Sequence, residues 1–87
     1  MSLDFLMEAV GWIGAVLILA GYALLTAGRL KSDSVGYQAL NVVGAVGFIA
    51  NGLWHQAMPS AVLNVIWAAI GLVALVRIEA KARASRG

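Results

Sequence analysis

Hydrophobic positions along this chain fall into three long runs, which two short polar breaks separate. The runs extend over residues 5–27, 35–54 and 58–76. A helix needs about 20 residues to cross the ~30 Å hydrocarbon core of a bilayer, and each run is close to that length. The pattern therefore predicts a bundle of three membrane-spanning helices, over about 5–27, 35–54 and 58–77.

The composition supports a membrane environment. Hydrophobic residues make up 62% of the chain and charged residues 11%, and the mean hydropathy is +0.90. Because soluble domains are about a quarter charged, this chain lacks the polar side chains to cover a water-facing surface. We expect an all-α integral membrane protein with one three-helix transmembrane domain, residues 1–80, and a short basic tail, residues 81–87.

The positive charges lie on one side of the predicted helices. Arg29 and Lys31 lie in the first break, and the other four basic residues follow the third run: Arg77, Lys81, Arg83 and Arg86. The positive-inside rule then places the N-terminus outside and the C-terminus in the cytoplasm, in a multi-pass membrane protein. Basic residues beside a membrane interact with anionic lipid, so membrane lipid is the expected partner rather than nucleic acid.

The breaks carry residues that end and start helices. Gly28 can adopt the left-handed conformation that ends a helix. Ser32, Asp33 and Ser34 can each cap the following helix with a side-chain oxygen. Pro59 suits the first turn of the third helix, where its missing N–H costs little.

Small residues recur on one face of each predicted helix. At ~100° per residue, Gly11, Gly14 and Gly21 share a stripe on the first helix, and Gly44 and Gly71 lie on stripes of the other two. Small side chains let backbones approach closely, which drives helix packing in lipid. We expect these glycines to form packing surfaces, and a groove that admits a substrate is the alternative.

Amide and aromatic side chains lie inside the hydrophobic runs. Asn41, Phe48 and Asn51 share a face of the second helix, and Asn64 and Trp67 share a face of the third. An amide that faces lipid would lose its hydrogen bonds to water, so these faces should meet protein or a wet cavity. Hydrogen bonds between helices and a binding site for a neutral, hydroxyl-rich or planar ligand are both consistent with the pattern.

Catalytic chemistry is not indicated. The chain has no cysteine and a single histidine, His55, which predicts neither a metal centre nor a catalytic triad. The four acidic residues lie at or near the ends of the predicted helices, so no proton relay is expected within the membrane. We expect a protein that is not an enzyme and that has no cofactor.

The chain resembles the PQ-loop superfamily, and in particular its SemiSWEET-like half-transporters, over residues 11–78. The similarity lies in the glycine-rich first helix and in four further places: Lys31, Ser34, 44–52 and 59–64. Asn64 stands five residues after Pro59, as in the third helix of that family. By this alignment Phe48 replaces the pocket tryptophan of the family.

The resemblance implies a fold and an assembly. Members are small bacterial proteins of three transmembrane helices, and they dimerise to form a sugar path. The resemblance therefore implies a multi-pass protein of a bacterial cytoplasmic (inner) membrane. We therefore expect the third helix between the first two, a homodimer, and a pocket that Phe48 and Asn64 of both copies line. The Pro-Gln pair of the superfamily would fall at Leu24 and Leu25 and is absent, so the first helix should be straighter. The chain is most similar to uncharacterised small bacterial proteins that also lack this motif.

The resulting hypothesis is a dimeric facilitative transporter for a small neutral solute such as a sugar. Phe48 and Trp67 would stack on the solute, while Asn64, Asn41 and Asn51 would hydrogen-bond its hydroxyl groups. The alternative is a non-catalytic accessory or structural subunit of a larger membrane complex, which the missing proline fits equally well. A lipid- or quinone-binding protein is a third alternative, which rests only on the aromatic residues.

Overall fold

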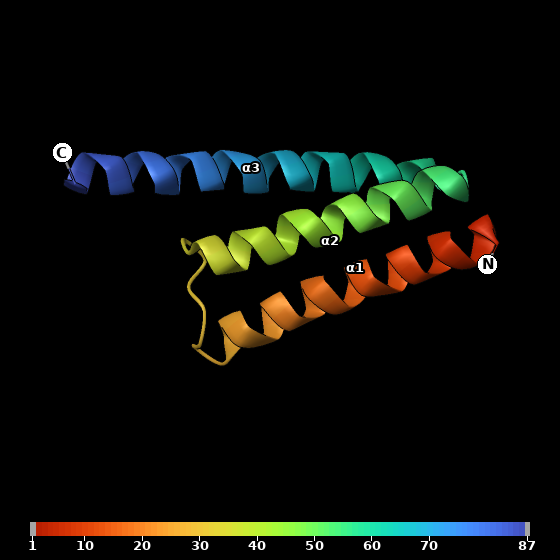
Figure 1. Ribbon diagram of the computed structural model, residues 1–87, viewed down its shortest axis with the longest axis horizontal. Helices are drawn as coiled ribbons and strands as arrows, with labels where there is room; N and C mark the ends of the chain where they lie inside the picture. Colours follow the sequence, from red (N-terminus) through yellow and green to blue (C-terminus); the bar gives the residue numbers. More distant parts are fainter. Residues whose placement is uncertain (1, 87) are drawn as a thin grey trace.

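Three helices joined by two short connections make up the computed structural model, which describes residues 2–86 (Figure 1). Helix α1 covers Leu3–Thr26, α2 covers Val35–Trp54 and α3 covers Met58–Arg86. The prediction of an all-α chain with three helices is confirmed. Helix α3 continues through residues 81–86, which the sequence suggested as a separate tail.

The connections begin and end the helices by local chemistry. Gly28 follows α1 with φ +77°, a left-handed conformation that glycine adopts without the steric cost of a Cβ. The Ser34 hydroxyl oxygen accepts a hydrogen bond from the backbone N–H of Tyr37 at 3.2 Å and so caps α2. Pro59 is the second residue of α3, where a backbone N–H has no partner within the helix.

Helix α2 lies between α1 and α3. It packs against both of them, whereas α1 and α3 form no packed pair within the described residues (Figure 1). The expectation that the third helix lies between the first two was therefore wrong. The reason is that α2 carries small residues on two faces: Gly44 and Gly47 meet α1, and Gly52 meets Ala61 of α3.

Within residues 2–86, two helices are long and apolar enough to cross a membrane, namely α1 and α3. The prediction of three transmembrane helices was therefore wrong. Helix α2 has sufficient length, but the amides of Gln38, Asn41 and Asn51 and its four glycines lower its hydropathy. In the structure α2 is the helix that the other two cover.

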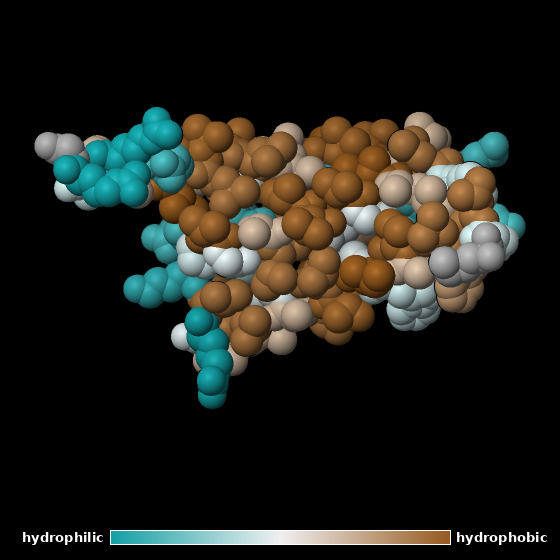
Figure 2. Space-filling view, viewed as in Figure 1, coloured by the Kyte–Doolittle hydropathy of each residue, from teal (hydrophilic) through white to brown (hydrophobic). Residues whose placement is uncertain are grey.

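Large hydrophobic side chains cover the outside of the molecule (Figure 2). The buried apolar residues are Ala45, Ala61 and Ala68, and no large side chain in residues 2–86 is fully buried. Exposed apolar side chains on α1 and α3 include Trp12, Val16, Leu19, Leu63, Ile70 and Val76. Because soluble monomers rarely expose more than a few hundred Å² of contiguous apolar surface, these flanks are compatible with a membrane protein.

Charge is concentrated at one end of the molecule, which is 49 Å long and 24 Å wide. The connection after α1 and the end of α3 lie at this end, and hydrophilic side chains gather there on the left of Figure 2. We call it the basic end, and its six basic residues are Arg29, Lys31, Arg77, Lys81, Arg83 and Arg86. The start of α1 lies at the opposite end with Asp4 and Glu8 (Figure 1).

Candidate functional site

Helices α1 and α2 meet backbone to backbone. A Cβ atom on Gly14 would lie 2.7 Å from the carbonyl oxygen of Gly44, and one on Gly47 would lie 2.9 Å from that of Val10. Real Cβ atoms essentially never approach a heavy atom closer than 3.0 Å. This contact therefore leaves no room for a side chain or a ligand at its centre.

Gly21 and Gly71 are also buried, and their nearest neighbours are side-chain atoms. A Cβ atom on Gly21 would lie 3.5 Å from the Cβ of Leu40, which is an ordinary contact distance. A Cβ atom on Gly71 would lie 2.6 Å from a methyl group of Val42. Gly71 therefore lies where α3 crosses α2, while Gly21 lies where α1 and α2 are less tightly packed.

Asn51 connects α2 to α1. Its Nδ2 donates a hydrogen bond to the carbonyl oxygen of Met7 at 2.8 Å. The same amide lies over Gly11, where a Cβ atom would be only 2.5 Å from Nδ2. Because the amide of Asn51 donates to the backbone of α1 and packs over Gly11 of the same helix, Asn51 has a structural role in this chain.

The other predicted ligand residues of α2 do not meet those of α3. Asn41 is 5% exposed, so its amide is buried between the helices. Phe48 lines a hollow of about 320 Å³ between α1 and α2, together with Glu8, Trp12 and Asn51. A single chain therefore does not bring Phe48 into one pocket with Asn64.

Asn64 and Trp67 lie together on α3. The Nδ2 of Asn64 donates to the carbonyl oxygen of Ser60 at 2.9 Å, one turn earlier in the same helix. Asn64 is partly exposed and Trp67 is 46% exposed. These two residues are the predicted ligand residues that an additional molecule could reach most easily.

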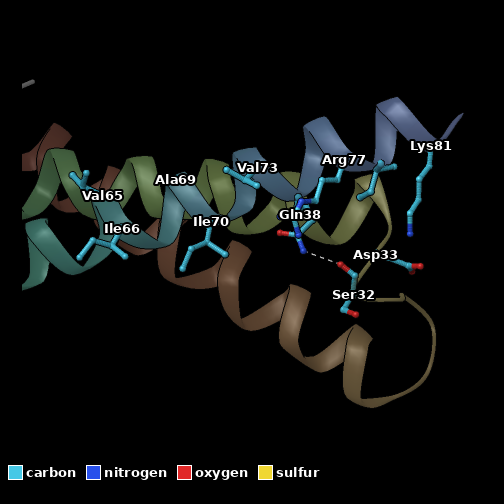
Figure 3. A pocket seen from close by; sticks show the side chains of 12 residues that line it. Ser32, Asp33, Gln38, Val65, Ile66, Ala69, Ile70, Val73, Arg77 and Lys81 are labelled. Atoms are coloured by element: carbon cyan, nitrogen blue, oxygen red, sulfur yellow. Dashed lines mark hydrogen bonds between the residues drawn. The ribbon is translucent and has the colours of Figure 1, made fainter. Parts of the chain in front are cut away.

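A larger groove runs along α3 and was not predicted from the sequence (Figure 3). Its volume is about 910 Å³, and we call it the α3 groove. Its apolar part consists of α3 side chains: Val65, Ile66, Ala69, Ile70, Val73, Ala74 and Ile78. Its polar end, which lies at the basic end of the molecule, consists of Ser32, Asp33, Gln38, Arg77 and Lys81.

The polar end of the groove brings three segments together. Gln38 of α2 donates a hydrogen bond from Nε2 to the carbonyl oxygen of Ser32 at 2.8 Å, which holds the first connection against the helices (Figure 3). Arg77 and Lys81 reach the same place from successive turns of α3 (Figure 3). The sequence signal was their spacing of four residues directly after an apolar helix face.

Polar contacts at the opposite end fasten α1 to the end of α2. The Trp54 indole Nε1 donates to Asp4 Oδ1 at 2.8 Å, and His55 Nε2 lies 3.2 Å from Glu8 Oε1. Within residues 2–86, no group of three or more histidine, aspartate or glutamate side chains is placed to hold a metal ion. The two contacts pair residues of α1 with residues at the end of α2.

Comparison with known proteins identifies a family but no function. No curated protein and no solved structure matches the chain. A model of a family that is uncharacterised matches residues 7–83, which include nearly all of the three helices. The match covers most of the sequence, and the protein therefore belongs to this uncharacterised family.

Proposed function

We propose that the protein is a small integral membrane protein that works as one subunit of an oligomer. Its two most apolar helices, α1 and α3, lie on the outside of the three-helix layer with large hydrophobic side chains exposed. Lipid tails or another apolar helix can cover such a surface, whereas water cannot do so without a large cost. The small alanine-lined core gives one chain little internal packing of its own.

The basic end faces the cytoplasm in this proposal, in a bacterial cytoplasmic membrane. Arg29 and Lys31 directly follow α1, and Arg77 and Lys81 follow the apolar part of α3. Both apolar helices thus have their positive charges at the same end (Figure 2). This is the charge distribution that the positive-inside rule associates with the cytoplasmic side.

The observation that best supports an oligomer is the environment of Asn64. Its Nδ2 is bonded within α3, while the partly exposed side chain lies among apolar residues of a candidate membrane span. In lipid, a polar group of this kind is stabilised by a hydrogen bond from another helix. In a two-fold symmetric homodimer the same residue of each copy can supply that partner to the other.

A path for a small neutral solute is the second candidate, and the adjacency of Asn64 and Trp67 favours it. An amide and a half-exposed indole ring on one face can hydrogen-bond and stack on a sugar-like molecule. The site would need both copies, because neither residue lines either of the two hollows described above. Phe48, Asn41 and Asn51 are not part of this revised site.

Native mass spectrometry of the protein after gentle extraction tests the oligomer. We expect a homodimer that Asn64→Ala dissociates at least in part, because the substitution removes the polar contact between copies. Leu63→Ala is the matched control, since it shortens a neighbouring side chain that is 63% exposed. A monomer at every protein concentration, or a dimer equally stable in both variants, would contradict the proposal.

Uptake of radiolabelled sugars into proteoliposomes tests the second candidate. We expect Trp67→Ala to lower uptake while the dimer persists, because it removes only the stacking surface. Uptake equal to that of empty liposomes for a broad panel of neutral solutes would exclude the path and leave the oligomer unaffected.

A further inference from the structure

We propose that the α3 groove binds one anionic membrane phospholipid, with an acyl chain against its apolar part and the phosphate at Arg77 and Lys81. This inference rests on the membrane placement proposed above and adds a ligand to it. The groove joins a continuous apolar face to a cationic end within one surface (Figure 3). Phospholipids have the same two-part chemistry.

The apolar part of the groove matches one leaflet in length. The stretch from Val65 to Ala74 rises about 14 Å at 1.5 Å per residue. Half of a ~30 Å hydrocarbon core is about 15 Å. An acyl chain that lies along this stretch therefore places its headgroup close to Arg77, one turn further along α3.

The positive charges at the polar end have no carboxylate partner in residues 2–86. Ion pairs in this region join Glu79 to Arg83 at 2.9 Å and to Arg86 at 3.6 Å. Neither Arg77 nor Lys81 belongs to an ion pair there, although both line the groove. Two cations one turn apart are therefore available for a phosphate group, which a guanidinium can bind through two parallel hydrogen bonds.

The remaining polar groups of the groove decide which lipid it favours. Asp33 also lines this end and leaves it with a net charge of one positive unit when counted with Arg77 and Lys81. The hydroxyl of Ser32 adds a neutral hydrogen-bond donor beside them. This charge favours an anionic headgroup over a zwitterionic one, whose own cation offsets its phosphate.

A second copy of this chain fits the groove less well than a lipid does. In a parallel dimer packed through the α3 groove, Arg77 and Lys81 of one copy would face the same residues of the other. Like charges brought together in this way are destabilising. The charge of the groove therefore argues for an anionic occupant, and the basic end of a second chain does not supply one.

Native mass spectrometry of the protein, extracted from vesicles of equimolar phosphatidylglycerol and phosphatidylcholine, tests the proposal. We expect the protein to retain phosphatidylglycerol preferentially, and the double variant Arg77→Gln/Lys81→Gln to lose roughly 25-fold in this preference, at about fivefold for each cation. The control is Arg83→Gln/Arg86→Gln, which removes the same total charge from residues already paired with Glu79. The control variant should keep most of the preference for phosphatidylglycerol. An equal loss in both double variants would overturn the assignment of the phosphate to Arg77 and Lys81.

A second variant tests the apolar part. Ala69→Phe fills the exposed groove without changing its charge, so we expect less retained phosphatidylglycerol, and inorganic phosphate should not displace the lipid. Unchanged retention in this variant, or displacement by inorganic phosphate, would contradict binding of a whole phospholipid. The same spectra report the oligomeric state, so a dimer without lipid preference refutes this inference alone, and a monomer refutes the proposed assembly.

Discussion

The contact between Gly14 and Gly44 gives a sharp test of how α1 and α2 pack. In Gly14→Ala, the new Cβ atom would lie 2.7 Å from the Gly44 carbonyl oxygen, whereas ordinary contact begins at 3.4 Å. Because the obstructing atom belongs to the backbone, the helices must separate by about 0.7 Å (3.4 − 2.7). We therefore expect this variant to weaken the pair of helices along the whole contact.

The size of the destabilisation by Gly14→Ala follows from the loss of close packing. A gap of about 0.5–1 Å forfeits a quarter to a half of the attraction between the atoms on its two sides. Forcing an extra methyl group into a packed contact costs about 1–3 kcal/mol. Alanine also favours a helix over glycine by about 1 kcal/mol, which partly hides the effect in a single variant.

Gly21→Ala is the matched control, because it makes the same substitution in the same helix. Its Cβ atom would lie 3.5 Å from Leu40, an ordinary contact, so we expect this variant to be as stable as the parent or up to about 1 kcal/mol more stable. The gain in helix propensity is common to both variants. Gly14→Ala should therefore be about 1–3 kcal/mol less stable than Gly21→Ala.

Unfolding in mixed micelles with increasing sodium dodecyl sulfate, followed by circular dichroism, measures this difference. Equal free energies of unfolding for the two variants would refute the close backbone approach of α1 and α2. A Gly21→Ala variant less stable than Gly14→Ala would show that the tight contact lies near Gly21, contrary to the structure.

Three further predictions concern polar contacts. Asn51→Ala removes the bond to the Met7 carbonyl and should lower the free energy of unfolding in the same micelle assay by about 1 kcal/mol; an unchanged value would contradict its structural role. Trp54→Phe keeps an aromatic ring but loses the hydrogen bond to Asp4. It should lower the free energy of unfolding by less than about 1 kcal/mol in that assay, and a much larger loss would show that the indole contributes more than this hydrogen bond. Asp33→Asn removes the negative charge from the α3 groove and should raise the preference for phosphatidylglycerol over phosphatidylcholine by about fivefold in native mass spectra; a lowered preference would contradict the charge argument.

Local features of the fold could be predicted because they depend on neighbouring residues. The left-handed Gly28 and the capping Ser34 bound the first connection as the sequence indicated. Their chemistry acts over a few residues and needs no knowledge of the rest of the chain. The existence of three helices followed from the three hydrophobic runs, which can also be read from neighbouring residues.

The order of the helices could not be predicted from helix faces alone. A stripe that contains Gly44 indicates a close contact, but it does not say which helix approaches. Helix α2 carries a further small residue, Gly52, on the face that meets α3, and this makes it the central helix. The resemblance to half-transporters led instead to a central third helix, while the length of the hydrophobic run over residues 35–54 led us to count α2 as a membrane span.

The candidate site was predicted residue by residue but not as an arrangement. Asn51 and Phe48 share a face of α2, and in the structure that face meets α1, while Asn64 belongs to α3. The α3 groove escaped prediction because Gln38 and the first connection complete it from distant parts of the sequence. Only the packing of α2 against α3 brings these segments to Arg77.

The central claim is that α1 and α3 are embedded in a membrane with the basic end in the cytoplasm. The chain contains no cysteine, so Ser2→Cys and Lys31→Cys each introduce a single thiol, one beyond each end of α1. A membrane-impermeant maleimide applied to intact bacterial cells should label Ser2→Cys and should reach Lys31→Cys only after the cells are permeabilised. Labelling that depends on permeabilisation in both variants, with the protein in the soluble fraction, would contradict membrane insertion, and the reverse pattern would contradict the orientation.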